Sequence, residues 1–467
     1  MEEQSFDQDI RIETEDYELP FTTEQMPDQQ FNGLPAKLSV HRVYPVNQEG
    51  YSVAKHAVVL IHGRSVPGPV VFDLQFTAPD GRELSVQKAL ARAGIDTFVP
   101  SLLGYGESTR FSLNDPYNAS FRGYPTDDTG AVLPCTFGGV SPPEGCDSTS
   151  NAAIFPLDQQ GTMLLNNPLD GKRHKHTSTV RFARTDVWVR DIRQVIDSAI
   201  ERAQPINGKV ALVGYSAGGQ HVGRTLYVMK RDDPTHPKVS RVVFLNSLFF
   251  AAARTEEPEN IMSPTFPLTL NDRLGSDANW QMKYEPLGGC GEEETCSGHI
   301  IPGIQEQVWC QTLKLDSKGS KWGGRPDHPT GLNRSPTFVG YGWNKEVAGQ
   351  LEIPTLVMQG LNDTALPPPT GALTGKTIYD NLSRAEYKVL VQVKCASHAL
   401  PWEGCSGPRC MPGTGETPYG GNLNQPWAGP HATLKAALIE SIKDEKFNGQ
   451  PSGSWNVDQS GVARPAS

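Results

Sequence analysis

The sequence predicts an α/β protein in which a mostly parallel sheet is flanked by helices. Short, unbroken apolar runs recur along the chain, and runs without polar alternation are typical of strands buried on both faces. Segments whose apolar residues follow the helical period lie between these runs. Strands and helices that alternate in this way favour a parallel sheet with helices on both sides.

The predicted elements begin at residues 55–61, where the run KHAVVLI leaves no polar face. Residues 85–93 read as a helix capped by Ser85 and ended by Gly94. A strand at 95–100 comes next, and residues 185–202 carry the single apolar stripe of a helix. The same patterns predict a strand at 209–214, a helix at 220–230, strands at 239–245, 355–359 and 387–393, and a final helix at 431–447.

Two long stretches, at about residues 109–178 and 251–350, interrupt this rhythm. Both are rich in Gly, Pro, Asn and Asp and are far longer than ordinary connections. Such stretches are typical of lids or binding loops, and surface decoration is the alternative. The predicted organisation is an acidic arm at 1–37, a domain at 38–447 that carries both insertions, and a tail at 448–467.

The net charge of −10 in 467 residues is concentrated at the N-terminus. Residues 1–30 hold ten Asp and Glu against the single Arg11, which accounts for −9 of it. The near-neutral remainder is a poor surface for nucleic acid, and no apolar run approaches the roughly 20 residues of a membrane span. We therefore expect a small-molecule partner and a mobile or peripherally draped arm whose removal leaves kcat unchanged. The sequence leaves the oligomeric state open.

The eight cysteines suggest disulfides and an oxidising compartment. Six of them form short-range neighbours at Cys135 and Cys146, Cys290 and Cys296, and Cys405 and Cys410. Cys310 and Cys395 are left over and could pair with each other, although the sequence does not determine the connectivity. Eight reduced thiols, or zinc bound by Cys290, Cys296, His299 and Cys310, are the alternatives. We expect a secreted or periplasmic protein whose leader is absent from the chain, with a cytoplasmic protein as the alternative because residues 1–30 lack signal-peptide features.

The pentapeptide at 214–218, GYSAG, fits the pattern G-x-S-x-G. A chain rich in glycine produces this pattern by chance, so its position carries the argument. It lies where a predicted strand ends and a helix begins, which places Ser216 on a tight turn with its hydroxyl above the sheet. The flanking glycines allow the sharp bend, and the helix N-terminus favours the negative charge that develops in acyl transfer.

A serine nucleophile needs a base to take its proton and an acid to orient that base. His398 and Asp363 each follow a predicted strand, so with Ser216 they lie at C-terminal strand ends, where open parallel sheets hold their sites. His221 is a weaker candidate for the base because it points along its own helix. Asn362 lacks the charge that stabilises an imidazolium.

Acyl transfer also needs two donors for the oxyanion. The amide of Ala217, directly after the nucleophile, is the first. The segment IHGRSVPGP after the first strand supplies the second from Arg64 or Gly63, and a glycine-rich turn without a catalytic role is the alternative. The charge of Arg64 offers a different role, which is to hold a substrate carboxylate.

Together these residues resemble the α/β-hydrolase superfamily. The resemblance rests on GYSAG with Ser216, His62-Gly63, LGYGES at 103–108, QGLNDT with Asp363, and ASHALPWE with His398. It spans about residues 38–447 apart from the insertions, which match no subfamily. It implies an eight-stranded, mostly parallel sheet, a lid at about 251–350, and no metal or organic cofactor.

The predicted activity is that of a serine hydrolase that cleaves a carboxylic ester or lactone through an acyl-enzyme. The tryptophans of the second insertion and the near-neutral body favour a hydrophobic or aromatic substrate, with candidate contacts at Tyr215, Trp280, Trp309 and Trp402. The alternatives are a carbon–carbon bond hydrolase of the β-diketone type, an acyltransferase, and a binding protein without activity. A serine at the turn disfavours dehalogenase and epoxide hydrolase chemistry, which uses Asp there in related members.

Overall fold

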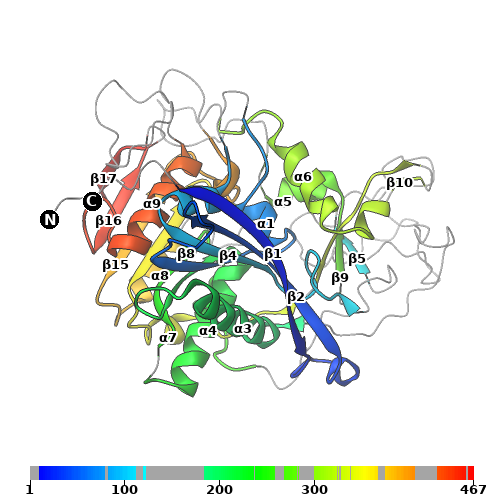
Figure 1. The fold of residues 1–467 in the computed structure, drawn as a ribbon, viewed down its shortest axis with the longest axis horizontal. Coiled ribbons are helices and arrows are strands. Elements are labelled where there is room, and N and C mark those ends of the chain that lie inside the picture. The colour runs from blue at the N-terminus through cyan, green and yellow to red at the C-terminus, as the bar shows by residue number, and fades with distance from the viewer. Residues whose placement is uncertain are drawn as a thin grey trace.

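A computed structural model describes residues 10–78, 83–111, 119–122, 183–235, 237–257, 268–280, 282, 299–322, 324–325, 328–336, 338–365, 374–404, 429–458 and 461–466. Within these residues the main sheet has ten strands (Figure 1). Their order across the sheet is β1 (Arg11–Thr22), β2 (Pro35–Val46), β4 (Ile95–Ser101), β3 (His56–Ile61), β7 (Val210–Tyr215), β8 (Val239–Leu245), β14 (Thr355–Gly360), β15 (Lys388–Val393), β16 (Gly453–Val457) and β17 (Ala463–Pro465).

The predicted α/β fold with a mostly parallel sheet is confirmed. Every pair from β4 to β16 is parallel, whereas β1–β2, β2–β4 and β16–β17 are antiparallel. The six predicted strands correspond to β3, β4, β7, β8, β14 and β15 within one residue at each end. The expectation of eight strands is wrong, because strands near the two termini extend both edges of the sheet.

Helices cover both faces of the sheet and enclose two hydrophobic cores (Figure 1). Alternate residues of one strand supply the two cores, with Val59 and Ile61 in the first and Val58 and Leu60 in the second. The helices of the first core are α3 (Thr185–Ala203), α4 (Ala217–Asp232), α7 (Lys345–Ala348) and α8 (Thr374–Asn381). Those of the second are α1 (Gly68–Phe72), α2 (Val86–Arg92), α6 (Ile304–Lys314) and α9 (Pro430–Asp444).

The acidic N-terminal segment is not the peripheral arm that its composition predicts. Its residues 11–22 form β1, which pairs with β2 over its whole length. Tyr17, Leu19 and Phe21 alternate with exposed residues and pack against the first core. Glu15 forms ion pairs with Arg42 and Arg202. Partners of opposite charge on the neighbouring elements, together with the two-residue alternation, make this acidic stretch a strand.

The C-terminal segment expected as a tail also belongs to the sheet. Residues 453–457 form β16, which continues the parallel pairing beyond β15, and residues 463–465 form β17 at the edge. Val457 is fully buried in the second core. The domain therefore begins before residue 38 and continues beyond residue 447.

The two insertions meet in a second, smaller sheet. Its order is β12 (Asn333–Pro336), β9 (Leu268–Asn271) and β5 (Ala119–Arg122), in which β5 comes from the first insertion and runs parallel to β9 from the second. We call these strands, together with α5 (Arg273–Asn279), the adjoining Trp280 and α6 (Ile304–Lys314), the cap. The cap lies at one end of the main sheet, on the right in Figure 1. Residues 123–178 of the first insertion lie outside the described residues.

Short elements complete the described chain. The strands β6 (Ala183–Arg184) and β13 (Phe338–Val339) pair in parallel, and β10 (Gly324–Arg325) and β11 (His328–Pro329) form a small antiparallel pair. Three-residue helical turns lie at η1 (Gln29–Phe31), η4 (Gly319–Lys321) and η6 (Leu400–Trp402). The last of these follows the loop of His398.

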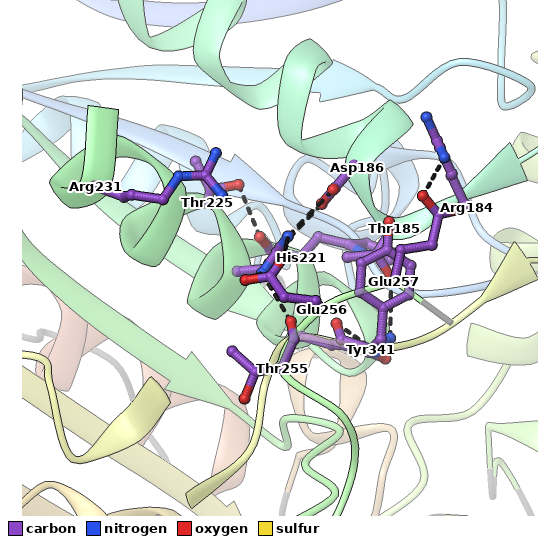
Figure 2. Close-up of polar contacts among 12 residues, drawn as sticks. Arg184, Thr185, Asp186, His221, Thr225, Arg231, Thr255, Glu256, Glu257 and Tyr341 are labelled. Carbon is purple, nitrogen blue, oxygen red and sulfur yellow. Dashed lines mark hydrogen bonds and ion pairs between the residues drawn. The ribbon is translucent and has the colours of Figure 1, made fainter. Parts of the chain in front are cut away.

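An ion-pair cluster ties the start of the second insertion to the main domain (Figure 2). The buried guanidinium of Arg224 on α4 contacts Asp186 at 3.0 Å and Glu256 at 2.9 Å. Arg184, directly before α3, pairs with Glu257. Because Glu256 and Glu257 lie where the chain leaves the main domain, these contacts fix the base of the insertion against α3 and α4.

Cys310 and Cys395, which the sequence left as a possible pair, are not bonded to each other. Cys310 is a free thiol exposed on α6, where its Sγ donates a hydrogen bond to Glu306. Cys395 is buried at the end of β15 and is disulfide-bonded. Sequence order says nothing of the distance between a cap helix and a strand end of the main sheet. The other six cysteines, at 135, 146, 290, 296, 405 and 410, lie outside the described residues.

Candidate active site

Ser216 occupies a strained turn between β7 and α4. Its backbone φ of 55° and ψ of −124° are unusual for a residue with a side chain. The turn is held from both sides, because the Ser216 amide donates to the carbonyl of Leu245, and the Ser216 carbonyl accepts from the amides of Gly219 and Leu248. The predicted strand-to-helix turn is therefore present in the structure.

The flanking glycines are required by close contacts. A Cβ on Gly214 would lie 2.6 Å from the Cα of Gly219, and one on Gly218 would lie 2.4 Å from the carbonyl oxygen of His62. Gly214 thus faces the backbone of its own turn, and Gly218 packs against the end of β3. These two contacts leave no room for a side chain at either outer position of the motif.

The structure brings Ser216, His398 and Asp363 together. The Nε2 of His398 lies 2.9 Å from the Oγ of Ser216, and its Nδ1 lies 2.9 Å from the Oδ2 of Asp363. Because Asp363 is a carboxylate, Nδ1–H donates to it, and Nε2 is left to accept from the serine hydroxyl. All three residues are buried, with exposed fractions of 8%, 4% and 0% for Ser216, His398 and Asp363.

Further donors hold the carboxylate of Asp363. The Nε2 of Gln359 donates to Oδ2 at 3.0 Å, and the amide of Ala365 donates to Oδ1 at 3.1 Å. Asn362, the alternative to Asp363, uses its backbone amide to bond the carbonyl of Ala396. Asp363 is therefore the residue of this loop whose carboxylate reaches the imidazole.

The backbone of the His398 loop is clamped from two strands. Tyr215 stacks its ring on the imidazole at 5.4 Å and donates its hydroxyl hydrogen bond to the His398 carbonyl. The Nδ2 of Asn246, directly after β8, donates to the carbonyls of Ser397 and His398 at 2.8 and 3.3 Å. The Oδ1 of Asn246 accepts from the amide of Gly360 at 2.8 Å, so one side chain links the loops of the acid and the base.

A buried carboxyl group holds the same loop from the other side. Glu403 is fully buried, and its carboxyl accepts from the amide of Ser397 at 2.9 Å and from the Ser397 hydroxyl. Burial raises the pKa of Glu403 to about 8, against the opposing effect of the Ser397 hydrogen bonds. Ser397 is the residue directly before His398, so Glu403 reaches the base through one neighbour.

The loop after β3 runs along the nucleophile. A Cβ on Gly63 would lie 2.7 Å from the Cβ of Ser216 and 3.2 Å from its Oγ, so the Gly63 backbone directly faces this side chain. His62 fixes the loop, because its Nδ1 pairs with the Gly63 carbonyl at 2.6 Å and its Nε2 accepts from the amide of Leu102 at 3.1 Å. Burial lowers the pKa of His62 to about 4, so the ring is neutral at pH 7.

The predicted substrate contacts are mostly buried. Tyr215 has no exposed surface, and Trp402 is 1% exposed with its Nε1 donating to the Val70 carbonyl. Trp280, after α5, lies against Tyr215, His398 and Trp402 at ring distances of 5.7, 5.8 and 5.1 Å. Trp309 lies on α6 and is 7% exposed. Trp280 is thus the cap residue of this set that reaches the imidazole.

The alternative base lies in a different environment. His221 is buried in α4 with its ring 4.7 Å from that of Trp188. Burial lowers its pKa to about 3, which favours a neutral ring packed in the core.

Among the described residues no group of three or more His, Cys, Asp or Glu side chains is arranged to hold a metal ion. Cys290 and Cys296 of the zinc alternative lie outside those residues.

Three residues that position the loops of His398 and Asp363, namely Asn246, Gln359 and Glu403, were not predicted from the sequence. Asn246 and Gln359 had a usable signal, because each is a polar residue at the end of an apolar strand run. Glu403 had none, since it lies in an irregular segment rich in cysteine and glycine.

In the described part of the chain, no helix is long and apolar enough to cross a membrane.

Comparison with known proteins gives one family match. The model of the alpha/beta hydrolase family matches residues 58–406, which is most of the chain. No curated protein matches the sequence.

Three similar solved structures are 12% to 15% identical to this chain. A bromoperoxidase from Bacillus anthracis is 14% identical, with 79% of this chain and 90% of that one covered and a TM-score of 0.37. A 2-hydroxy-6-oxo-6-phenylhexa-2,4-dienoate hydrolase from Rhodococcus sp. strain RHA1 is 15% identical, with coverages of 84% and 95% and a TM-score of 0.37. A soluble variant of monoglyceride lipase from Saccharomyces cerevisiae is 12% identical, with coverages of 91% and 95% and a TM-score of 0.38.

Proposed function

Because this chain belongs to the alpha/beta hydrolase family, we propose that it is a serine hydrolase that cleaves a carboxylic ester or lactone through an acyl-enzyme. The observation that carries the proposal is the chain of two hydrogen bonds from Ser216 Oγ through His398 to Asp363, each 2.9 Å long. A hydroxyl bonded to an imidazole that a carboxylate orients is an activated nucleophile.

In the first half of the proposed reaction, Nε2 of His398 takes the hydroxyl proton as Ser216 Oγ attacks the carbonyl carbon. The imidazolium that forms is stabilised by the buried carboxylate of Asp363. His398 then gives this proton to the leaving oxygen, the carbon–oxygen bond breaks, and an acyl-serine remains. In the second half, His398 takes a proton from water as its oxygen attacks the acyl carbon, and returns the proton to Ser216.

The oxyanion of each tetrahedral intermediate is assigned to two backbone amides. Ala217 is the first residue of α4, so its N–H points out of the helix N-terminus beside Ser216. The second amide is that of Arg64 or Gly63, and the close approach of Gly63 to the Oγ of Ser216 supports this loop as its source. Removal of one such donor typically costs about a hundredfold in kcat.

A hydrophobic or aromatic acyl group suits the surroundings of the site. Trp280 of the cap lies against both Tyr215 and His398, so we assign its ring to the wall of the acyl pocket. Replacing Trp280 by Ala should raise KM for an aryl ester more than for an acetate ester. Equal changes for the two esters would remove Trp280 from the substrate contacts.

The activity test compares the wild type with Ser216→Ala on a panel of aryl esters, lactones and β-diketones. We expect ester or lactone turnover that Ser216→Ala reduces by about a thousandfold or more. A fluorophosphonate probe should label the wild type and not the variant, while Ser247→Ala, which changes a nearby serine, keeps its label. A β-diketone cleaved much faster than any ester would favour carbon–carbon bond cleavage instead, and transfer of the acyl group to an alcohol in preference to water would identify an acyltransferase.

A further inference from the structure

We propose that the guanidinium of Arg64 binds a carboxylate of the substrate, so that the preferred esters or lactones carry an anionic group. This inference rests on the proposed function, because it names the substrate class of the same site. It concerns the side chain of Arg64, whereas the oxyanion assignment concerns backbone amides.

Arg64 lies between the nucleophile and the cap. It directly follows Gly63, whose backbone faces the side chain of Ser216. Its Nη2 donates to the Oγ1 of Thr269 on β9 at 2.9 Å. The positive group is therefore held where the loop of the main domain meets the sheet that both insertions build.

The charge of Arg64 has no acidic partner among the described residues. Its hydrogen bond is to the hydroxyl of Thr269, which is neutral, and its Nε is buried without a hydrogen-bond partner. Burial lowers the pKa of Arg64, with a small opposing effect from Tyr105. A buried cation without an anion is unfavourable, and guanidinium binds carboxylates through paired N–H donors. Arg64 retains such donors for a ligand.

Other charges near this loop are also predominantly positive. The side chains of Arg110 and Arg334, at most 9% exposed, share the carboxylate of Asp316 at 3.4 and 2.7 Å. Tyr105 interacts electrostatically with both Arg64 and Arg110, so both guanidiniums lie near this side chain. Three guanidiniums against one carboxylate leave a charge of +2 in this group. An anionic substrate would reduce that excess.

A purely structural role for Arg64 is the competing explanation. Between described residues, two hydrogen bonds attach the loop to the cap, from Arg64 to Thr269 and from the Nδ2 of Asn333 to the carbonyl of Ser65. If Arg64 only joins the loop to the cap, losing its partner should matter as much as losing its charge. Thr269→Val removes that hydrogen bond at nearly constant volume and leaves the guanidinium in place, so it is the matched control.

The binding test uses Ser216→Ala protein, so that no turnover is needed. Calorimetry compares N-phenylglutaramate, which carries a carboxylate, with its neutral methyl ester. We expect the anion to bind at least about tenfold more tightly, as for a charge-assisted hydrogen bond. Adding Arg64→Met should remove this preference, Arg64→Lys should keep part of it, and Thr269→Val should keep most of it.

The kinetic test compares 4-nitrophenyl hydrogen glutarate with the methyl-capped neutral ester in the wild type. The kcat/KM for the anionic ester should be about tenfold higher than that for the neutral ester in the wild type. In Arg64→Met the two values should become nearly equal. Equal affinities for the two amides, or a preference that Arg64→Met leaves unchanged, would overturn the proposal. If both esters resist Ser216-dependent hydrolysis while the anion preference in binding persists, the proposed function fails and the anion site stands.

Discussion

The carboxyl group of Glu403 bonds both the backbone amide and the hydroxyl of Ser397, the residue that precedes His398. Because burial raises its pKa to about 8, this carboxyl is mostly protonated at pH 7. Glu403→Ala should therefore lower kcat by about tenfold with a smaller change in KM, since the base loses its backbone support.

The control for this prediction is Glu403→Gln, which has the neutral charge and nearly the shape of the protonated acid. Its amide oxygen can still accept from the Ser397 amide, so we expect it to retain most of the wild-type kcat at pH 7. If Glu403→Ala and Glu403→Gln were equally impaired at unchanged stability, a positioning role through Ser397 would be excluded.

His41 links the N-terminal strand to the main domain in a pH-dependent way. Its ring lies between the carboxylates of Asp16 on β1, at 2.6 Å, and Asp73 after α1, at 2.8 Å. Burial opposes protonation, but the hydrogen bonds with Asp16 and Asp73 raise the pKa of His41 to about 9 from 6.5. The stabilisation is complete below pH 6.5 and is lost as the pH rises through 9.

The pKa difference corresponds to on the order of 3 kcal/mol in the free energy of unfolding. Urea denaturation at pH 6 and pH 9.5 should show a larger loss of stability for the wild type than for His41→Asn. Parallel pH dependence of the two proteins would show that His41 does not contribute this effect.

Removal of the acidic segment should destabilise the protein. Without residues 1–30 the chain loses β1 and the packing of Tyr17, Leu19 and Phe21 against the first core. We expect a loss of at least about 2 kcal/mol in the free energy of unfolding, from apolar burial alone. Glu15→Gln, which removes the charge of a partly exposed side chain, should cost under about 1 kcal/mol. If the truncated protein had an unchanged Tm, residues 1–30 would be dispensable for stability, as expected of a peripheral arm.

Alkylation should distinguish the two described cysteines. Iodoacetamide should modify Cys310 in the native, unreduced protein, because this thiol is free and exposed. Burial, with the neighbouring Glu306, raises the pKa of Cys310, so labelling should accelerate as the pH increases. Cys395 should react only after reduction and unfolding. Peptide mass spectrometry identifies the labelled residue, and Cys395 labelling without reductant would contradict its disulfide.

The central strands were predictable because they are buried on both faces, whereas the edge strands were not. β3 and β7 need only an unbroken apolar run to be recognised, and their predicted bounds are correct within one residue. β1 has alternating acidic and apolar residues, and its pairing partner supplies much of its stability. Low apolar content suggested an arm, although Arg42 and Arg202 neutralise one of its acids.

The candidate site shows the same division between local and distant information. Ser216, Asp363 and His398 each follow a strand, so strand prediction and a local motif were sufficient to select them. The contacts that hold His398 depend on distant residues, since Asn246 lies 151 positions from Ser397. No local pattern encodes that proximity. Glu403 lies only six positions from Ser397, but its contact depends on how the irregular segment between them folds.

The parallel pairing of β5 with β9 makes the cap a joint product of two insertions. The two segments must therefore be inherited or exchanged as a unit. A chimaera that imports a new second insertion alone would present β9 to a foreign β5 and risk a misassembled cap. Specificity engineering in this scaffold should transplant both segments together. Arg64 stays in the main domain, and the new second insertion should carry equivalents of Thr269 and Asn333 to attach the loop to the cap.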